Sequence, residues 1–241
     1  MRYLELTLAD PAANLALDEA LLEEAELSED DPSSELLRVW EPKQPFVVLG
    51  RSSLLEQEVN VKACQQLEVP VLRRVSGGAT IVTGPGCLMY AVLLSYARRP
   101  ELRLLDRAHQ SVMENQRRAI QSLGIDCSIQ GICDLTLGAK KFSGNSLRCR
   151  RNFLLYHGTI LYDFSLSMLG TCLGTPQRQP DYRQQRSHLE FVTNIEATRE
   201  ELIRALRDVW EAGNETATWP ELTTFRLATE KYSRLEWTSR H

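Results

Sequence analysis

Short apolar runs bounded by glycine, proline and polar residues alternate along this chain with longer segments in which apolar residues recur every three or four positions. The short runs are typical of buried strands, and the longer segments are typical of amphipathic helices. Strands are therefore predicted at residues 1–8, 36–40, 46–49, 71–74, 80–82, 88–95, 125–129, 135–137, 141–147 and 154–162. Helices are predicted at residues 11–25, 53–67, 104–123, 165–173, 199–212 and 222–235.

The order of these elements indicates the fold class. Strands and helices are mixed without the regular alternation of a doubly wound sheet, so we expect an α+β fold with a largely antiparallel, mixed sheet and flanking helices. The 241 residues, 43% of them hydrophobic, are enough to bury a sizeable core. We predict a single domain over residues 1–241, without a C-terminal accessory domain. The acidic stretch from Glu23 to Glu35 is interpreted as a solvated connection within that domain.

Charge and cysteine content argue against several classes of function. The formal net charge of −4 offers no basic footprint for nucleic acid, and no apolar run is long enough to cross a membrane. The six cysteines form no CxxC pair and no zinc-like spacing with histidine, so neither a disulfide framework nor a permanent metal site is indicated. The N-terminus lacks the basic region of a signal peptide. We therefore expect a cytoplasmic protein.

Three glycine-containing segments carry candidate chemistry: residues 73–78 read Arg-Arg-Val-Ser-Gly-Gly, residues 138–144 read Gly-Ala-Lys-Lys-Phe-Ser-Gly, and residues 156–159 read Tyr-His-Gly-Thr. Glycine lets the backbone approach an anion closely, and arginine and lysine supply charge-assisted donors. Together they predict a site for carboxylate and phosphate groups, as acyl activation or acyl transfer requires. In the alternative interpretation, Ser-Gly-Gly is an ordinary turn beside a surface arginine pair.

With residues 14–21, which read Asn-Leu-Ala-Leu-Asp-Glu-Ala-Leu, these segments resemble the lipoate-protein ligase A family of the biotin and lipoate ligase superfamily. The resemblance spans roughly the whole chain and implies the fold of that catalytic domain. In the family, the Arg-Arg-x-Ser-Gly-Gly stretch wraps the acyl chain and its activated carboxyl group. The resemblance assigns substrate or cofactor contacts to Arg73, Arg74, Ser76, Gly77, Gly78, Asp134, Ser143, Gly144, His157, Gly158 and Thr159.

The resemblance also implies a reaction. Lipoate and ATP with Mg²⁺ are the implied substrates, and the implied partner is a lipoyl carrier domain of the 2-oxoacid dehydrogenase acyltransferase or glycine-cleavage type. Lys141 is the predicted catalytic residue, because a cation there stabilises the carbonyl oxygen and phosphate of an acyl-adenylate. Asp134 matches a position near the nucleotide and its Mg²⁺, although an aspartate at a strand start also suits a turn. His157 is expected to shape the pocket.

The chain also departs from the ligase pattern. Ala79 stands where the ligases carry a third glycine, and the turn at residues 83–86, Thr-Gly-Pro-Gly, is similar to that of octanoyltransferases in the same superfamily. Those enzymes take an acyl group from acyl carrier protein onto a cysteine. Cys127 and Cys172 are the candidate nucleophiles under that reading, and buried packing is the alternative for both. His188, with neighbouring arginines, is a further candidate contact for phosphate or the carrier.

Three functions therefore remain open. The first is a ligase that joins lipoate, or a related medium-chain acid, to a carrier lysine through an acyl-adenylate. The second is an octanoyltransferase that uses acyl carrier protein and a cysteine thioester. The third is a noncatalytic relative that only binds the acyl ligand or its carrier. Because many ligases carry an additional C-terminal domain for which this chain has no room, a separate accessory subunit is a further expectation.

Overall fold

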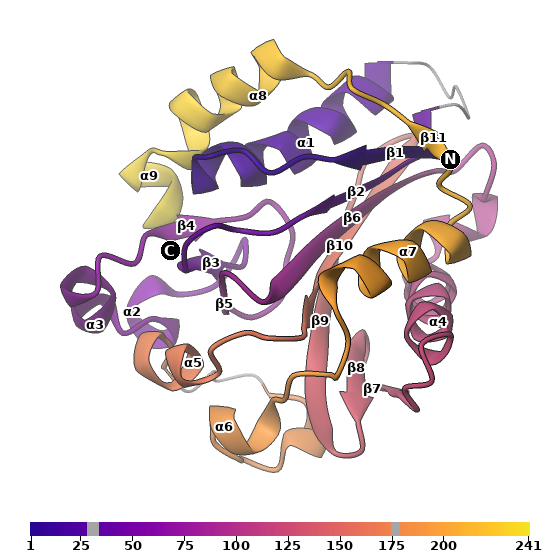
Figure 1. Cartoon of the computed structure of the whole chain (residues 1–241). Coiled ribbons are helices and arrows are strands. Elements are labelled where there is room, and N and C mark those ends of the chain that lie inside the picture. The colour runs from indigo at the N-terminus through magenta and orange to yellow at the C-terminus, as the bar shows by residue number, and fades with distance from the viewer. Residues whose placement is uncertain (28–33, 175–178) are drawn as a thin grey trace.

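A mixed sheet of eight strands forms the centre of the part of the chain that this computed structural model describes, which is residues 1–27, 34–174 and 179–241 (Figure 1). Its strand order is β11-β1-β2-β6-β10-β9-β8-β7, and a second sheet has the order β4-β3-β5. The strands are β1 Arg2–Glu5, β2 Leu36–Trp40, β3 Phe46–Leu49, β4 Val71–Arg73, β5 Ile81–Thr83, β6 Cys87–Ser95, β7 Ser128–Gln130, β8 Asp134–Leu137, β9 Lys140–Cys149, β10 Phe153–Leu161 and β11 Asn214–Glu215. Neighbouring strands are antiparallel except for β1 beside β2 and β11, and β3 beside β4. The predicted α+β fold with a largely antiparallel, mixed sheet is confirmed.

Helices cover both sides of the large sheet. In Figure 1, α1 packs with α8 on one side of the sheet and α4 lies beside α7 on the other. The helices are α1 Pro11–Leu27, α2 Leu55–Glu58, α3 Val61–Gln66, η2 Pro100–Arg103, α4 Leu105–Gln121, α5 Ser167–Cys172, η3 Asp181–Arg183, α6 His188–Phe191, α7 Arg199–Val209, α8 Glu221–Leu227, η4 Ala228–Tyr232 and α9 Leu235–Thr238. Among the described residues, no helix is both long enough and apolar enough to cross a membrane.

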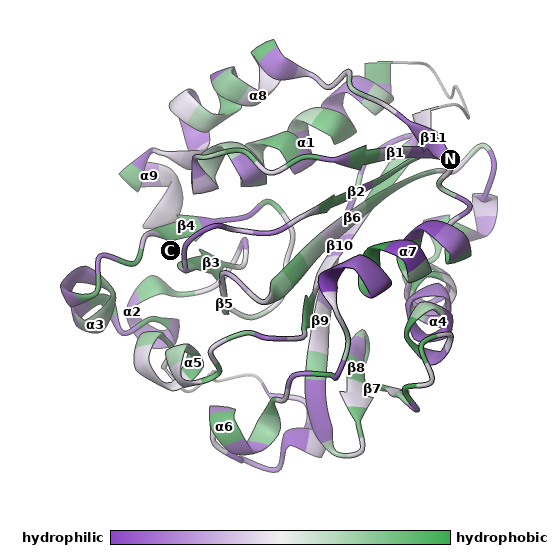
Figure 2. Ribbon diagram, viewed as in Figure 1, coloured by the Kyte–Doolittle hydropathy of each residue, from purple (hydrophilic) through white to green (hydrophobic). Residues whose placement is uncertain are grey.

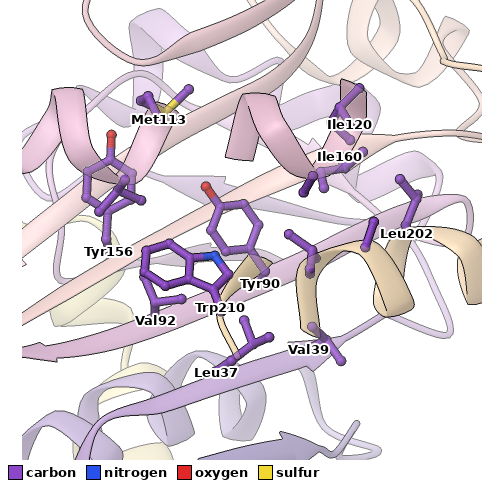
Figure 3. Packing of buried hydrophobic residues seen from close by; sticks show 14 of the residues in the cluster. Leu37, Val39, Tyr90, Val92, Met113, Ile120, Tyr156, Ile160, Leu202 and Trp210 are labelled. Atoms are coloured by element: carbon purple, nitrogen blue, oxygen red, sulfur yellow. The ribbon is translucent and has the colours of Figure 1, made fainter. Parts of the chain in front are cut away.

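One core lies between the large sheet and helices α4 and α7. Tyr90 and Tyr156 project from neighbouring strands β6 and β10 toward Trp210, which follows α7, and Met113 of α4 packs against the same cluster (Figure 3). The apolar residues of α4 and α7 fall on one side of each helix, and the outward sides are hydrophilic (Figure 2). Burying this apolar surface fixes both helices against the sheet.

A second core surrounds α1, which is buried along most of its length. Ala16, Leu17 and Ala20 are fully buried, and the helix contacts β6 and β10 on one side and α8 and η4 on the other. The helix begins where the side chain of Asp10 accepts a hydrogen bond from the Ala12 N–H group at 2.9 Å. This packing holds the polar residues of α1 beneath strand β10, close to the segments that carry the candidate chemistry.

Two predicted helices are divided in the structure. Residues 53–67 form α2 and α3, because the Asn60 side chain accepts a hydrogen bond from the Ala63 N–H group and starts a new helix. Residues 222–235 do not form one helix, since α8 passes into the wider η4 turn and α9 begins only at Leu235. In both cases the breaks turn the chain back toward β4 and the residues that follow it.

The acidic stretch from Glu23 to Glu35, which was predicted to be solvated, ends in a buried residue. Residues 28–33 of this stretch lie outside the described residues, whereas Glu35 is buried. Its carboxylate accepts hydrogen bonds from the Arg99 Nε atom at 3.0 Å and from the Ser95 N–H group at 3.2 Å. The expectation of a fully solvated stretch is therefore wrong for Glu35, because two arginines and a backbone donor compensate its burial.

Candidate functional site

A pocket lies between the two sheets, where the three sequence segments meet. Its walls include Gly78, the strand β9 from Lys141 to Ser146, and β10 from His157 to Thr159. Apolar side chains from several elements line another part of the wall, namely Leu15, Val48, Val82, Met89, Leu161, Leu169, Leu173 and Phe191. One pocket therefore combines an apolar lining with a group of polar and charged residues, a combination typical of binding sites for amphipathic ligands.

Arg74 holds the Ser-Gly-Gly turn from behind. Its Nε atom donates to the Ser76 hydroxyl oxygen at 3.1 Å, and Nη2 donates to the carbonyl oxygens of Gly77 and Ala79. Its Nη1 atom donates to the Val48 carbonyl oxygen at 3.1 Å, and no carboxylate among the described residues forms an ion pair with it. Burial lowers the pKa of the Arg74 guanidinium to about 10, so the group remains charged at neutral pH.

The turn itself presents backbone donors. The Gly77 carbonyl oxygen accepts from Arg74 and the Ser76 carbonyl oxygen from the Arg51 N–H group, whereas the N–H groups of Ser76, Gly77 and Gly78 have no hydrogen-bond acceptor among the described residues. Gly78 has a φ of +87°, which an L-residue rarely adopts, and a Cβ atom there would lie 2.9 Å from Arg74 Nη2. A Cβ atom at Gly77 would meet no atom within 4 Å, so this position faces open space. Successive amides without a protein acceptor beside a buried cation are typical of an anion-binding nest.

Arg73 occupies a different environment from its neighbour. It is fully buried, its Nη1 atom donates to the Gly50 and Ser53 carbonyl oxygens, and its Nη2 atom donates to the Thr238 carbonyl oxygen at 2.6 Å. The side chain does not line the pocket. The predicted substrate contact of Arg73 is therefore replaced by a structural role, because its donors connect β4 to the C-terminal helix and to the loop after β3.

Lys141 forms an ion pair at the pocket wall. Its Nζ atom lies 2.7 Å from Oδ1 of Asp134 on the neighbouring strand β8, and the lysine side chain is 27% exposed. The other carboxylate oxygen, Oδ2, accepts a hydrogen bond from the Tyr182 hydroxyl at 2.7 Å. A Cβ atom at Gly144 would lie 2.6 Å from Lys141 Nζ, so the glycine leaves the space through which the lysine side chain passes. This contact explains why a glycine stands three positions after Lys141.

The predicted role of Asp134 at Mg²⁺ is not what this geometry favours. Both of its carboxylate oxygens already have partners, and burial together with the Asp134 charge raises the pKa of Tyr182, which keeps the phenol protonated as a donor. In the described residues, no group of three or more histidine, cysteine, aspartate or glutamate side chains is placed to hold a metal ion. In this arrangement Asp134 is engaged in an ion pair with Lys141 and a hydrogen bond from Tyr182.

His157 connects the turn to helix α1. Its Nε2 atom lies 2.6 Å from the Ser76 hydroxyl oxygen, and its Nδ1 atom lies 3.1 Å from Oδ2 of Asp18. Burial alone would raise the pKa of Asp18, but the Arg38 and His157 partners hold it below its ordinary value. Asp18 belongs to the Asn-Leu-Ala-Leu-Asp-Glu stretch, which is part of the family resemblance but in which no site residue was predicted. That stretch was the signal by which Asp18 could have been found.

Strands β9 and β10 bring the remaining predicted residues together. A Cβ atom at Gly158 would lie only 1.7 Å from Asn145 Oδ1, so Gly158 makes room for the Asn145 side chain. Asn145 Nδ2 in turn donates to the Ser143 hydroxyl oxygen at 3.1 Å, and the Thr159 hydroxyl lies 3.4 Å from the Gly144 carbonyl oxygen. Sequence reasoning missed Asn145, although it directly follows the Lys-Phe-Ser-Gly segment and lines the pocket.

The two candidate nucleophiles lie outside the pocket. Cys127 is buried in the core beneath α4, and Cys172 is buried at the end of α5. Burial raises the pKa of Cys127 to about 11 and also raises the pKa of Cys172, so both thiols are protonated at neutral pH. Neither residue lines the pocket. This arrangement does not favour either cysteine as a nucleophile, since neither thiol meets a ligand in the pocket.

His188 reaches the pocket wall from helix α6. Its Nδ1 atom lies 3.4 Å from Nη2 of Arg183, whose guanidinium stacks over the Phe191 ring at 4.9 Å. Burial is the main cause that lowers the pKa of His188, and the Arg183 charge adds to it. The structure thus brings His188 and the nearly buried Arg183 to the same pocket as Lys141.

Comparisons with known proteins place the chain in a family. The model of the family described as "Lipoyl protein ligase A/B catalytic domain" matches residues 10–209. The octanoyltransferase LipM of Oceanobacillus iheyensis is 26% identical over a gapped alignment of 251 positions, which covers 97% of this chain and 90% of LipM. A probable lipoate-protein ligase A of Mycoplasma pneumoniae is 26% identical over 185 residues, which cover 77% of this chain and 52% of that protein. The chain thus spans about half the length of that ligase.

Solved structures share the fold. A bi-partite lipoate protein ligase from Thermoplasma acidophilum, described with its E2 lipoyl domain, aligns with a TM-score of 0.82 at 22% identity and covers 99% of this chain and 95% of its own. A lipoate-protein ligase A bound with ATP aligns with a TM-score of 0.78 at 22% identity and covers 99% of this chain and 98% of its own. At this level of identity, the two structures establish the fold of the chain.

Proposed function

Because the chain belongs to the lipoyl protein ligase A/B catalytic domain family, we propose that it joins lipoate, or a closely related medium-chain acid, to a lysine of a carrier domain through an acyl-adenylate. One observation carries the proposal: the Ser-Gly-Gly turn, held by the buried Arg74, reaches the pocket at Gly78, and Lys141 and an apolar wall line the same pocket. The apolar wall suits the acyl chain, while the nest and Lys141 suit the two anionic groups that must meet during activation.

The chemistry of adenylation explains why both positive elements are needed. The carboxylate oxygen attacks the α-phosphorus of ATP, pyrophosphate leaves, and a mixed anhydride forms. Two anions approach each other in this step, so fixed donors lower the barrier most when they do not have to reorganise. The Ser76-Gly77-Gly78 amides are held in place by Arg74, and Lys141 is held by Asp134.

Lys141 also suits the transfer step. When the ε-amine of the carrier lysine attacks the acyl carbon, negative charge develops on the carbonyl oxygen and AMP leaves. A lysine ammonium placed in the pocket wall stabilises that oxyanion and the departing phosphate. The ion pair with Asp134 limits the positions that the flexible lysine side chain can adopt.

ATP, Mg²⁺ and a lipoyl carrier domain are the proposed co-substrates and partner. The ATP-bound relative and the relative described with its E2 lipoyl domain support these assignments. Mg²⁺ is treated as part of the ATP substrate, because the described residues offer no metal cluster of their own. One structural relative is a bi-partite ligase, and on that basis we also propose that a single catalytic domain works here with a separate accessory subunit.

An octanoyltransferase is the second candidate, because LipM aligns with 97% of the chain. That reading needs a reactive thiol in the pocket, and no cysteine is among the described residues that line it. The ligase reading needs no thiol, so the structure favours it. A binding-only relative is less well supported, since Lys141 and the amide nest together form a site suited to charge that develops during a reaction.

A paired assay separates these possibilities. Purified protein is mixed with lipoate, MgATP and an apo carrier domain, and a parallel sample receives octanoyl-acyl carrier protein in place of lipoate and ATP. Intact mass spectrometry then detects modification of the carrier. Modification that depends on ATP supports the ligase, and modification from the acyl carrier alone supports the transferase. If neither sample reacts, addition of preformed lipoyl-adenylate distinguishes a missing accessory subunit from a protein that only binds.

A further inference from the structure

A chain of buried hydrogen bonds runs from β2 to the Ser76 turn. Arg38 Nη1 donates to Asp18 Oδ1 at 2.6 Å, and Asp18 Oδ2 lies 3.1 Å from His157 Nδ1. His157 Nε2 lies 2.6 Å from the hydroxyl oxygen of Ser76. Arg38 is fully buried, and the side chains of Asp18 and His157 are only 5% and 12% exposed. The first helix of the chain is thus connected to the turn that presents the amide nest.

The position of each proton in this chain follows from the neighbouring groups. Arg74 Nε can only donate, so the Ser76 oxygen accepts that bond and its own proton is free to point at His157. A ring proton on Nδ1 of His157 lets Nε2 accept from the Ser76 hydroxyl and lets the Asp18 carboxylate accept from the ring. The Asp18 carboxylate is ionised and accepts this proton at one oxygen, while the other oxygen accepts from Arg38. One tautomer of His157 satisfies all these bonds.

We propose that Asp18 is a positioning residue, which fixes the tautomer and orientation of His157 and through it the Ser76-Gly77-Gly78 turn. The role in ligand binding rests on the proposed function, whereas the proton arrangement does not. Arg38 supports Asp18 by neutralising its buried charge and by bonding to the Asn14 carbonyl oxygen at 2.8 Å. The Asn-Leu-Ala-Leu-Asp-Glu stretch thereby gains a physical connection to a turn that is about sixty residues away.

The same three side chains have the arrangement of a serine nucleophile with its base, but the surroundings of Ser76 argue against that role. Ser76 is 1% exposed and does not line the pocket. Its oxygen accepts a hydrogen bond from the charged Arg74 guanidinium, which lowers the nucleophilicity of that oxygen. These hydrogen bonds therefore hold the turn in place, and Ser76 does not attack the substrate.

Nitrogen NMR of the histidine rings tests the proton arrangement without any assay of activity. Protein labelled with ¹⁵N in its histidine rings is measured at neutral pH, and the His157 signals are assigned by their loss in His157→Gln. The expected result is a neutral His157 with its proton on Nδ1. A proton on Nε2, or a doubly protonated ring, would overturn the proposal. This readout remains decisive even if the protein does not lipoylate a carrier.

Binding measurements test whether the arrangement matters for the ligand. Lipoate is titrated calorimetrically into wild type, Asp18→Asn, and Asp18→Asn combined with Arg38→Met, which removes the buried cation that the single variant leaves unpaired. The matched control is Glu35→Gln, which also neutralises a carboxylate buried against arginines but lies away from the pocket. Both Asp18 variants are expected to bind about tenfold more weakly, and Glu35→Gln is expected to bind like wild type.

The double variant separates positioning from stability. If it recovers the melting temperature of wild type but keeps the weak binding, the proposal is supported. If binding returns together with stability, or if Asp18→Asn binds as tightly as wild type, Asp18 serves only the fold and the proposal is wrong. If neither Asp18 variant folds, the NMR result decides alone. If wild type itself does not bind lipoate, the proposed function fails separately.

Discussion

The Nζ atom of Lys141 lies 2.7 Å from Oδ1 of Asp134, and the two residues come from adjacent antiparallel strands at the pocket wall. An ion pair that is partly exposed contributes only about 0 to 1 kcal/mol to stability. Its main consequence is therefore geometric, because it restricts a flexible lysine to one part of the pocket. Tyr182 completes the arrangement by donating to the second carboxylate oxygen of Asp134.

Removing the charge of Asp134 should impair the reaction more than the fold. Asp134→Asn keeps the shape of the side chain but no longer fixes Lys141, so we expect kcat to fall about 10- to 100-fold with a change in the free energy of unfolding of about 1 kcal/mol or less. Steady-state lipoylation kinetics and urea denaturation measure both effects. Tyr182→Phe, which keeps the carboxylate, should have the smaller effect. An unchanged kcat in Asp134→Asn would contradict a positioning role.

A methyl group at Gly77 should block the ligand without disturbing the fold. A Cβ atom there meets no protein atom within 4 Å, so Gly77→Ala should unfold at nearly the wild-type urea concentration, whereas lipoate or adenylate that approaches the turn would meet the added carbon. The affinity is expected to fall about tenfold or more. Gly213→Ala is the matched control, because its Cβ atom is also unobstructed but the residue does not belong to the Ser-Gly-Gly turn.

Gly78 provides the opposite test. Its φ of +87° means that alanine is strained whatever space is present, so Gly78→Ala should lose about 1 to 2 kcal/mol of unfolding free energy. The amide nest predicts that Gly78→Ala loses both affinity and stability. It predicts that Gly77→Ala loses affinity alone. Wild-type affinity in the Gly77 variant would mean that no ligand approaches the turn.

Substitution of the buried cysteines should leave the transfer reaction intact. Cys127→Ser and Cys172→Ser remove thiols that lie outside the pocket, so transfer to the carrier should stay within about twofold of wild type, with a loss of stability of about 1 kcal/mol from the buried hydroxyl. With a pKa of about 11, Cys127 should also react slowly with iodoacetamide at pH 7.5 in the folded protein. Loss of transfer in either serine variant would instead favour the octanoyltransferase reading.

His188 should make the fold less stable in mild acid. Burial lowers its pKa below the value of 6.5 in the unfolded chain, so below that pH the unfolded state binds a proton that the folded state binds less readily. The free energy of unfolding should therefore decrease as the pH falls through 6.5 toward 5. His188→Gln should show a smaller decrease over this range in urea denaturation. Parallel curves for the two proteins would show that His188 does not contribute.

The sequence predicted where most strands and helices lie, but it did not predict which way individual side chains point. The strands around the pocket were predicted from apolar runs because their burial depends on local composition. The two arginines at 73 and 74 were not distinguishable, since neighbouring residues at a strand end point to opposite sides and only the packing decides which one faces the turn. Arg73 bonds to Thr238, a contact across 165 residues that no local pattern contains.

The same limit applies to the site residues that were missed. Asn145 lines the pocket and Tyr182 bonds to Asp134 behind Lys141, and the residue types of Asn145 and Tyr182 alone carried no signal of these positions. Asp18 differs, because it stood within a stretch that was quoted for its resemblance, yet its partner His157 is 139 residues away. Cys127 and Cys172 were candidates because spacing along the chain does not report burial, and the structure shows that both are buried.

The most direct test of the central claim compares two neighbouring lysines. Preformed lipoyl-adenylate and an apo carrier domain are mixed with wild type, Lys141→Ala or the exposed control Lys140→Ala, and the rate at which the carrier gains a lipoyl group is followed by mass spectrometry. Lys140→Ala should match wild type, and Lys141→Ala should be slower by about 10²- to 10³-fold while unfolding normally. Equal rates for Lys141→Ala and wild type would contradict the account.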